Sequence, residues 1–106
     1  MNYRFMRLIV FFDLPMMTSA DIRQYNAFRK FLIKNGFIMM QKSVYSKLVV
    51  NGTVSDAVKA LVKKNLPKSG LVELLEITER QFGKIEYLIG EAQTGILDTD
   101  SRLVEV

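Results

Sequence analysis

Residues 4–12 read RFMRLIVFF, and Asp13-Leu14-Pro15 follows them directly. The run is almost continuously apolar and rich in residues that favour β-structure. Such a run predicts a central strand that is covered on both faces. Proline cannot donate to a strand ladder, so we expect the strand to end at this turn. The rest of the chain is interpreted around this strand.

A helix is predicted to follow the strand. Thr18 and Asp21 have the spacing of a capping box, with Asp in the place of Glu. Asn35-Gly36 is a typical helix stop. Between them, four residues recur at helical spacing and predict a buried stripe: Ile22, Tyr25, Phe28 and Leu32.

Further strands and a second helix are predicted after Gly36. Residues 37–40 and 43–50 predict two strands joined in a hairpin by Gln41-Lys42. Thr53, with Asp56 three residues on, is expected to cap a second helix whose apolar stripe is Val54, Val58, Leu61 and Val62. Residues 71–77 predict a fourth strand and residues 84–89 a further short one, while residues 78–82 are interpreted as a bend.

This order predicts an α+β fold of the ferredoxin-like type (βαββαβ), an antiparallel sheet with two helices on one face plus an extra C-terminal strand. Residues 1–90 form this domain, and residues 91–106 form an acidic C-terminal tail. The other sheet face would be left open and apolar. We therefore expect a symmetric homodimer through that face, in which the segment after Ile77 adds a strand to the partner.

The composition excludes several kinds of chemistry. The chain has 106 residues, with no cysteine and no histidine. This excludes disulfides, thiolate or imidazole metal ligands, and a Ser-His catalytic triad. The apolar run 8–12 is too short to span a bilayer and is not followed by a signal-peptide cleavage site. We therefore expect a cytoplasmic protein that is not associated with a membrane.

Charge is distributed unevenly along the chain. Residues 1–53 carry a net charge of +6 and residues 54–106 a net charge of −2. The basic part favours a polyanionic partner, although a merely solvated basic surface remains an alternative. The side chains expected to contact nucleic-acid phosphates are Arg23, Lys30, Lys34, Lys42, Lys59 and Lys63. A separate partner-binding role is predicted for the tail, through Glu91, Asp98, Asp100, Leu103 and Val104.

Asp13 is the strongest candidate for a chemical role, because it ends a wholly apolar strand. It is either a turn residue that caps backbone amides or a metal ligand. One carboxylate is too few for a Mg²⁺ site, but two copies facing each other across a dimer axis would suffice. Gln41, Ser43 and Tyr45 add polar groups in an otherwise apolar region.

These motifs together resemble a known family. The strand end Phe12-Asp13-Leu14-Pro15, Gly36 after the first helix, and Gln41-Lys42-Ser43-Val44-Tyr45 are similar to the Cas two family of CRISPR adaptation. The resemblance covers residues 3–90, and residues 74–82 are also similar to members from type II systems. Many members carry a charged residue where this chain has Met39 and Ser46.

The resemblance implies a ferredoxin-like homodimer that bridges two dimers of the Cas one integrase and binds the double-stranded protospacer DNA. Family members are also described as metal-dependent endonucleases on RNA or double-stranded DNA, which implies Mg²⁺ at Asp13. The missing charges at Met39 and Ser46 favour the scaffold over the nuclease. A regulatory domain that binds a small metabolite is a third class open to this fold.

Overall fold

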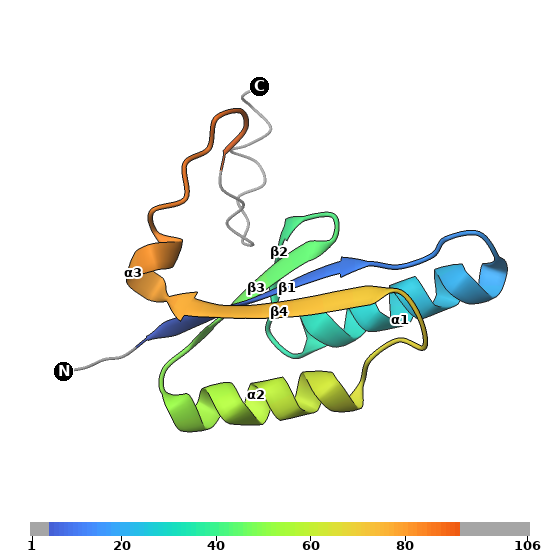
Figure 1. The fold of residues 1–106 in the computed structure, drawn as a ribbon, viewed down its shortest axis with the longest axis horizontal. Helices are drawn as coiled ribbons and strands as arrows, with labels where there is room; N and C mark the ends of the chain where they lie inside the picture. The colour runs from blue at the N-terminus through green and yellow to red at the C-terminus, as the bar shows by residue number, and fades with distance from the viewer. Residues whose placement is uncertain (1–4, 92–106) are drawn as a thin grey trace.

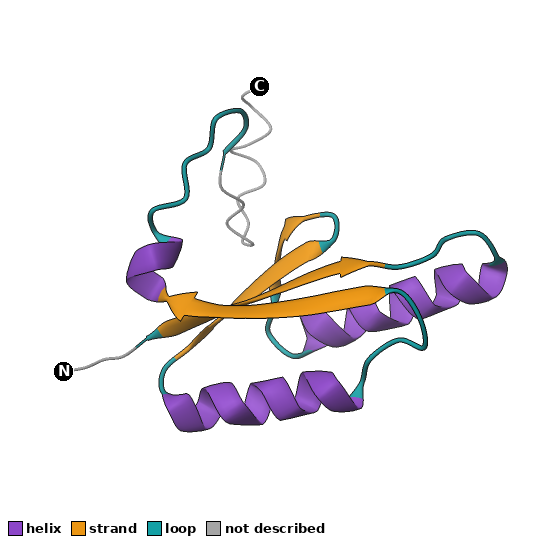
Figure 2. Cartoon of the chain, in the orientation of Figure 1, coloured by secondary structure: helices purple, strands orange, loops and turns teal. Residues whose placement is uncertain are grey.

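The computed structural model describes residues 5–91. Four strands form one antiparallel sheet in the order β2-β3-β1-β4: β1 (Met6–Asp13), β2 (Ile38–Gln41), β3 (Val44–Val49) and β4 (Leu71–Thr78). Two helices, α1 (Ser19–Lys34) and α2 (Gly52–Lys64), lie on one side of it (Figures 1 and 2). The ferredoxin-like prediction is confirmed, with the apolar strand between β3 and β4.

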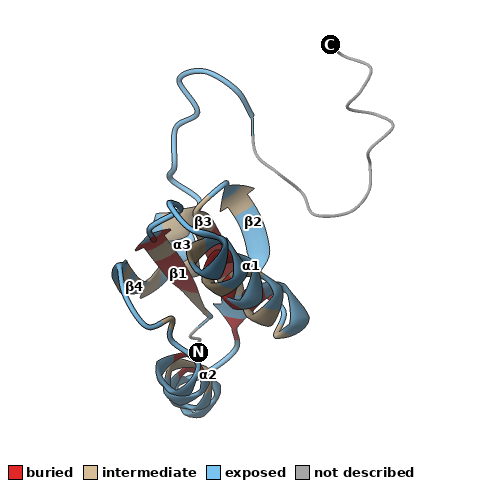
Figure 3. Cartoon of the chain, turned by 90° about the vertical axis from the view of Figure 1, so that its right-hand side faces the viewer, coloured by how far each residue is buried: buried red, intermediate tan, exposed pale blue. Residues whose placement is uncertain are grey.

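The core lies between the sheet and the helices. Figure 3 shows much of β1 coloured as buried. Alternate residues of β1 point to opposite faces, and Leu8, Val10 and Phe12 belong to the core cluster with Tyr25 and Phe28 of α1. The Phe12 ring lies 5.7 Å from Tyr25, 5.2 Å from Phe28 and 5.7 Å from Tyr45, measured between ring centroids. Each such pair adds about 0.5–1.5 kcal/mol beyond its buried area, so this cluster anchors α1 to the sheet.

The start of α1 confirms the predicted capping box. The Thr18 hydroxyl accepts from the Asp21 amide, and the Asp21 carboxylate accepts from the Thr18 amide. Tyr25, Phe28 and Leu32 are buried as expected. Ile22 is 42% exposed, so its place in the buried stripe was predicted wrongly. It lies in the first turn of α1, ahead of the turns that pack on the sheet.

The predicted start of α2 is wrong by two residues. Asn51, not Thr53, is the N-cap, and its side-chain oxygen accepts from the Val54 amide at 2.9 Å. The stripe is also rotated: Ser55 and Val62 are the buried residues of α2, while Val54 and Leu61 are about one-third exposed. The buried Ser55 hydroxyl has a hydrogen-bond partner there, because it donates to Glu76 of β4 at 2.9 Å.

Gly70 brings the loop after α2 against the end of β1. Its φ is +101°, a conformation that residues with a side chain rarely adopt. A Cβ at this position would lie 2.8 Å from the Asp13 carbonyl oxygen and 2.8 Å from Leu14 Cδ2. Glycine is therefore required where β4 begins beside Asp13.

The segment after β4 differs most from the prediction. Residues 78–82 are not a bend: α3 (Glu79–Phe82) starts with a capping box between Thr78 and Gln81. Residues 84–89, expected as a strand, form none in this chain. Residues 83–91, here called the C-terminal arm, leave the sheet after α3 and have no neighbouring strand to pair with among the described residues (Figure 1). Within residues 5–91, no helix is long and apolar enough to cross a membrane.

Candidate functional site

Asp13 lies where the apolar strand meets solvent. It is the last residue of β1, its side chain is exposed, and its Cα partner on β4 is Leu71. It lines a small hollow of about 140 Å³ together with Ser43 and Glu73. The Phe12 amide donates to the Ser43 carbonyl at 3.0 Å, so the β2–β3 turn is tied to the end of β1.

Glu73 is a site residue that the sequence reasoning missed. The register pairs Phe11 with Glu73 and Asp13 with Leu71, so Glu73 is a diagonal neighbour of Asp13 on the same face. The alternation of side chains along residues 71–77 places Glu73 on one face of its strand. It does not show that this face lies beside Asp13 unless the pairing of β4 with β1 is known. Asp13, Glu73 and Ser43 supply oxygen atoms only, which is the donor type that Mg²⁺ takes. Among residues 5–91, no three metal-ligating acidic side chains gather in one place.

The three polar residues of the hairpin do not converge on one site. Ser43 lines the hollow beside Asp13, whereas Gln41 lines a different hollow, on the face of the sheet away from α1 and α2. Tyr45 points the other way and is fully buried in the core. Its hydroxyl has no hydrogen-bond partner within the described part of the chain. Burial raises the pKa of the Tyr45 phenol, and the nearby Arg29 charge opposes this only in part.

Most of the predicted phosphate-binding side chains are exposed on the helix side. Arg23, Lys30 and Lys34 lie on the solvent face of α1, and Lys63 lies on that of α2. Lys42 is exposed in the β2–β3 turn, where its carbonyl accepts from the Tyr25 hydroxyl at 3.1 Å. The side chains point outward and leave their charges in water, as backbone contacts to a duplex require.

Lys59 is the exception. Its ammonium group forms an ion pair with Glu76, whose other carboxylate oxygen accepts from Ser55. The hydrogen bond from Lys59 holds the pKa of the Glu76 carboxyl below its ordinary value, and that of Ser55 acts the same way. The same contact raises the pKa of Lys59. Lys59 is therefore part of the α2–β4 contact, and its assignment to the phosphate-binding set stays a prediction.

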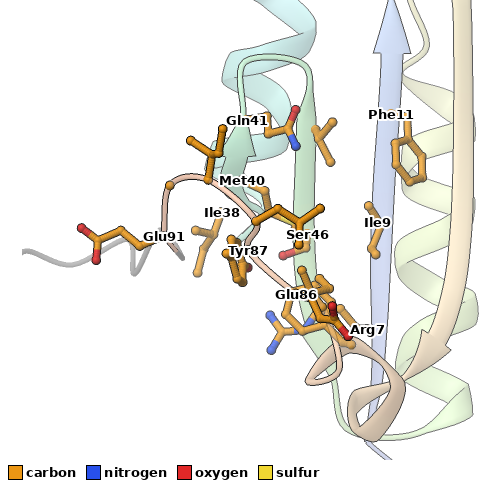
Figure 4. A pocket seen from close by; sticks show the side chains of 16 residues that line it. Arg7, Ile9, Phe11, Ile38, Met40, Gln41, Ser46, Glu86, Tyr87 and Glu91 are labelled. Atoms are coloured by element: carbon orange, nitrogen blue, oxygen red, sulfur yellow. The ribbon is translucent and has the colours of Figure 1, made fainter.

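The face of the sheet away from α1 and α2, here called the open face, forms the other candidate surface. The arm passes over it and leaves a hollow of about 930 Å³ between the two (Figure 4). The sheet contributes Ile9, Phe11, Ile38 and Ser46, and the arm contributes residues 85–91. At the rim of this face, Leu71 is 55% and Leu75 is 46% exposed. An apolar surface of this kind is unusual on a lone domain.

The predicted partner-binding residues are only partly covered by the structure. Glu91 is exposed and lines the large hollow at the end of the arm. Asp98, Asp100, Leu103 and Val104 lie outside the described residues.

Comparisons with known proteins agree with one another. The family model described as "CRISPR associated protein Cas2" matches residues 6–85. The chain is 57% identical to a CRISPR-associated endoribonuclease Cas2 of Treponema denticola, over 93% of this chain and 98% of the relative. It is 50% identical to the protein of the same name in Streptococcus mutans, over 93% of this chain and 91% of that relative. It is 44% identical to the protein of the same name in Acidovorax ebreus, over 80% of this chain and 83% of that relative. The match spans every element from β1 to α3, and this chain belongs to the CRISPR associated protein Cas2 family.

Proposed function

We propose that the chain is a dimeric scaffold that binds DNA backbone and bridges dimers of the Cas one integrase during spacer integration in the cytoplasm. The observation that carries this proposal is the separation of two surfaces. Exposed basic side chains, Arg23, Lys30, Lys34 and Lys63, lie on the helix side, and the apolar open face lies on the other. One surface suits a duplex and the other suits a second copy, so one chain can serve both contacts at once.

The DNA contact is proposed to be electrostatic and independent of sequence. Phosphate contacts position a protein on a duplex without reading its bases. Reversing Lys30 and Lys34 to Glu should lower the affinity for every duplex by about tenfold or more and reduce the salt slope by about two. The matched control is Arg80→Glu with Lys84→Glu, which changes the net charge equally but lies in α3 and at the start of the arm. A loss confined to one DNA sequence would contradict the proposal.

The acidic tail is proposed to dock on a basic surface of the Cas one integrase. Residues 91–106 carry four acidic side chains against one arginine. Deleting residues 91–106 should weaken assembly with Cas one in a pull-down or by calorimetry and leave homodimerisation intact. An unchanged affinity for Cas one after the deletion would exclude this role of the tail.

A second candidate is a metal-dependent endonuclease on RNA or double-stranded DNA. The names of the relatives carry the word endoribonuclease. The observation in its favour is the exposed Asp13 beside Glu73 and Ser43, an oxygen-only set that fits Mg²⁺. A bound Mg²⁺ would neutralise phosphate charge and lower the pKa of a coordinated water. In this reading Asp13 of each copy binds the metal at the dimer axis, and the basic side chains bind the RNA or double-stranded DNA.

One experiment separates the two candidates. Protospacer integration by purified Cas one is measured with the wild-type chain, with Asp13→Ala and with no addition, and RNA and duplex cleavage are measured in parallel with and without a chelator. Integration that survives Asp13→Ala supports the scaffold. If Asp13→Ala fails to support integration but still forms the dimer and the complex, Asp13 has a chemical role. That result supports the metal-dependent endonuclease. Cleavage that survives Asp13→Asn would come from a contaminant.

A further inference from the structure

The turn between β2 and β3 is held on two consecutive carbonyl groups. The Tyr25 hydroxyl of α1 donates to the Lys42 carbonyl at 3.1 Å, and the Phe12 amide of β1 donates to the Ser43 carbonyl at 3.0 Å. Both hydrogen bonds come from elements outside the hairpin. Tyr25 is the residue that connects the turn to α1.

The hairpin by itself gives this turn little support. β2 has only four residues and lies at the edge of the sheet, and its register against β3 shifts between Met39 and Gln41. An irregularity of this kind leaves a residue out of the ladder and disrupts the pairing locally. The position of residues 42 and 43 therefore depends on the hydrogen bonds that reach the turn from α1 and β1.

Tyr25 provides a rigid support for the turn. Its side chain is buried in the core, and its ring centroid lies 5.7 Å from that of Phe12. A tyrosine combines a packed apolar ring with a polar tip, so the packing of the ring also fixes the position of the hydroxyl oxygen. The core thereby sets the position of the Lys42 carbonyl.

The turn carries a positive charge at the end of the sheet where Asp13 lies. The Lys42 side chain is exposed, and the next residue, Ser43, lines the hollow beside Asp13. Of the six side chains predicted to contact phosphates, Lys42 is the one that is adjacent in sequence to a residue of this hollow. Three of the others lie on α1. The hydrogen bond of Tyr25 therefore connects two elements that both carry cations.

We propose that Tyr25 is a positioning residue for the nucleic-acid contact: its hydroxyl fixes the β2–β3 turn, and the fixed turn presents Lys42 to a phosphate group beside Asp13. The inference rests on the proposed contact with nucleic acid, which both candidate functions share. Ordering the turn before binding lowers the entropy that the contact costs. Tyr25 touches no phosphate itself, because it acts through the backbone of Lys42.

The test is a double-mutant cycle on the affinity for short duplex DNA and RNA, measured by fluorescence anisotropy at several salt concentrations. Tyr25→Phe keeps the ring and removes the hydroxyl. It should lower the affinity about threefold and, like Lys42→Ala, reduce the salt slope by up to about one. In the Lys42→Ala chain, Tyr25→Phe should have no further effect, because the group that it positions is absent.

Tyr45→Phe is the matched control, because Tyr45 is also packed on the Phe12 ring but its hydroxyl has no hydrogen-bond partner among residues 5–91. It should leave the affinity unchanged, and urea unfolding of each variant shows whether the fold is retained. An affinity that Tyr25→Phe leaves unchanged overturns the inference. An equal loss with and without Lys42 also overturns it, since the hydroxyl would then act on the fold in general. If the wild-type chain binds neither nucleic acid, the proposed contact fails and the inference fails with it.

Discussion

At Gly70, a single missing side chain determines how closely two loops approach. The positive φ and the short distance that would separate a Cβ from the Asp13 carbonyl oxygen both exclude a larger residue. The Asp13 turn is therefore supported from behind by the loop that precedes β4. The same turn carries the carboxylate on which the nuclease reading depends.

Gly70→Ala should lower the free energy of unfolding by about 1–3 kcal/mol, since alanine would have to adopt the strained conformation or displace the Asp13 backbone. Gly52→Ala is the matched control, because nothing lies within 4 Å of a Cβ there and the residue opens α2. Urea denaturation of both variants measures the difference. Equal stabilities of the two variants would show that the Gly70 loop adjusts freely.

At this scale the sequence was informative where the signal was local. Asp13 at a strand end and the Thr18–Asp21 capping box were predictable from neighbouring residues alone. Glu73 was not, because its position beside Asp13 depends on the register of two strands that are far apart in the chain. Lys59 looked like an ordinary surface cation, and only the packing of α2 on β4 shows that Glu76 holds it.

Among the elements, α2 shows how a cap can be misassigned. Thr53 and Asp56 have capping-box spacing, yet Asn51 caps the helix and Gly52 is its first residue. Asn51 and Thr53 lie two residues apart, and both residue types can cap a helix. Which of them caps α2 depends on where β3 ends. Ser55 then faces the sheet, which a purely apolar stripe did not predict.

Asn51→Ala should lower the free energy of unfolding by about 1 kcal/mol, the usual effect of losing an N-cap. Thr53→Ala tests the rejected assignment and should have an effect of less than about half of that. Thermal or urea unfolding of the two variants distinguishes them. A larger loss from Thr53→Ala would mean that the helix begins at the position the sequence suggested.

The predicted extra strand is absent from the described chain because it has no neighbouring strand to pair with. Residues 84–89 have a strand-like composition, but a strand needs a neighbour, and within the described chain the arm has none. The four strands of the sheet were all predictable. Each has a strand partner in the same chain, and β1, β3 and β4 also contribute residues to the core.

For the whole molecule, the central question is what covers the open face. The helices α1 and α2 lie together on one side of the sheet, and the sequence predicted this asymmetry correctly. It did not predict that the arm would pass over the open side and leave a hollow there. The arm follows α3, and α3 contacts Arg7 of β1, a residue that no local sequence pattern connects with it.

Leu75→Glu should weaken homodimerisation by tenfold or more, because it places a charge on the rim of the open face. Leu61→Glu is the matched control, since Leu61 is 38% exposed on α2, on the opposite side of the sheet. Analytical ultracentrifugation of both variants gives the two affinities. If Leu61→Glu has the larger effect, the helix side is the dimer surface and the assignment of surfaces must be exchanged.

The buried phenol of Tyr45 should make the fold sensitive to alkali. Its pKa is raised by burial, whereas in the unfolded chain it ionises near the ordinary 10.0, so Tyr45 contributes stability below pH 10 that is lost as the pH rises through the folded value. Tyr45→Phe should unfold less readily at high pH than the wild-type chain, while Tyr87→Phe, on the arm, should behave as the wild type does. Because the Tyr45 hydroxyl has no partner among residues 5–91, this gain should come with little loss at neutral pH. A variant as sensitive to alkali as the wild type would place that sensitivity in another group.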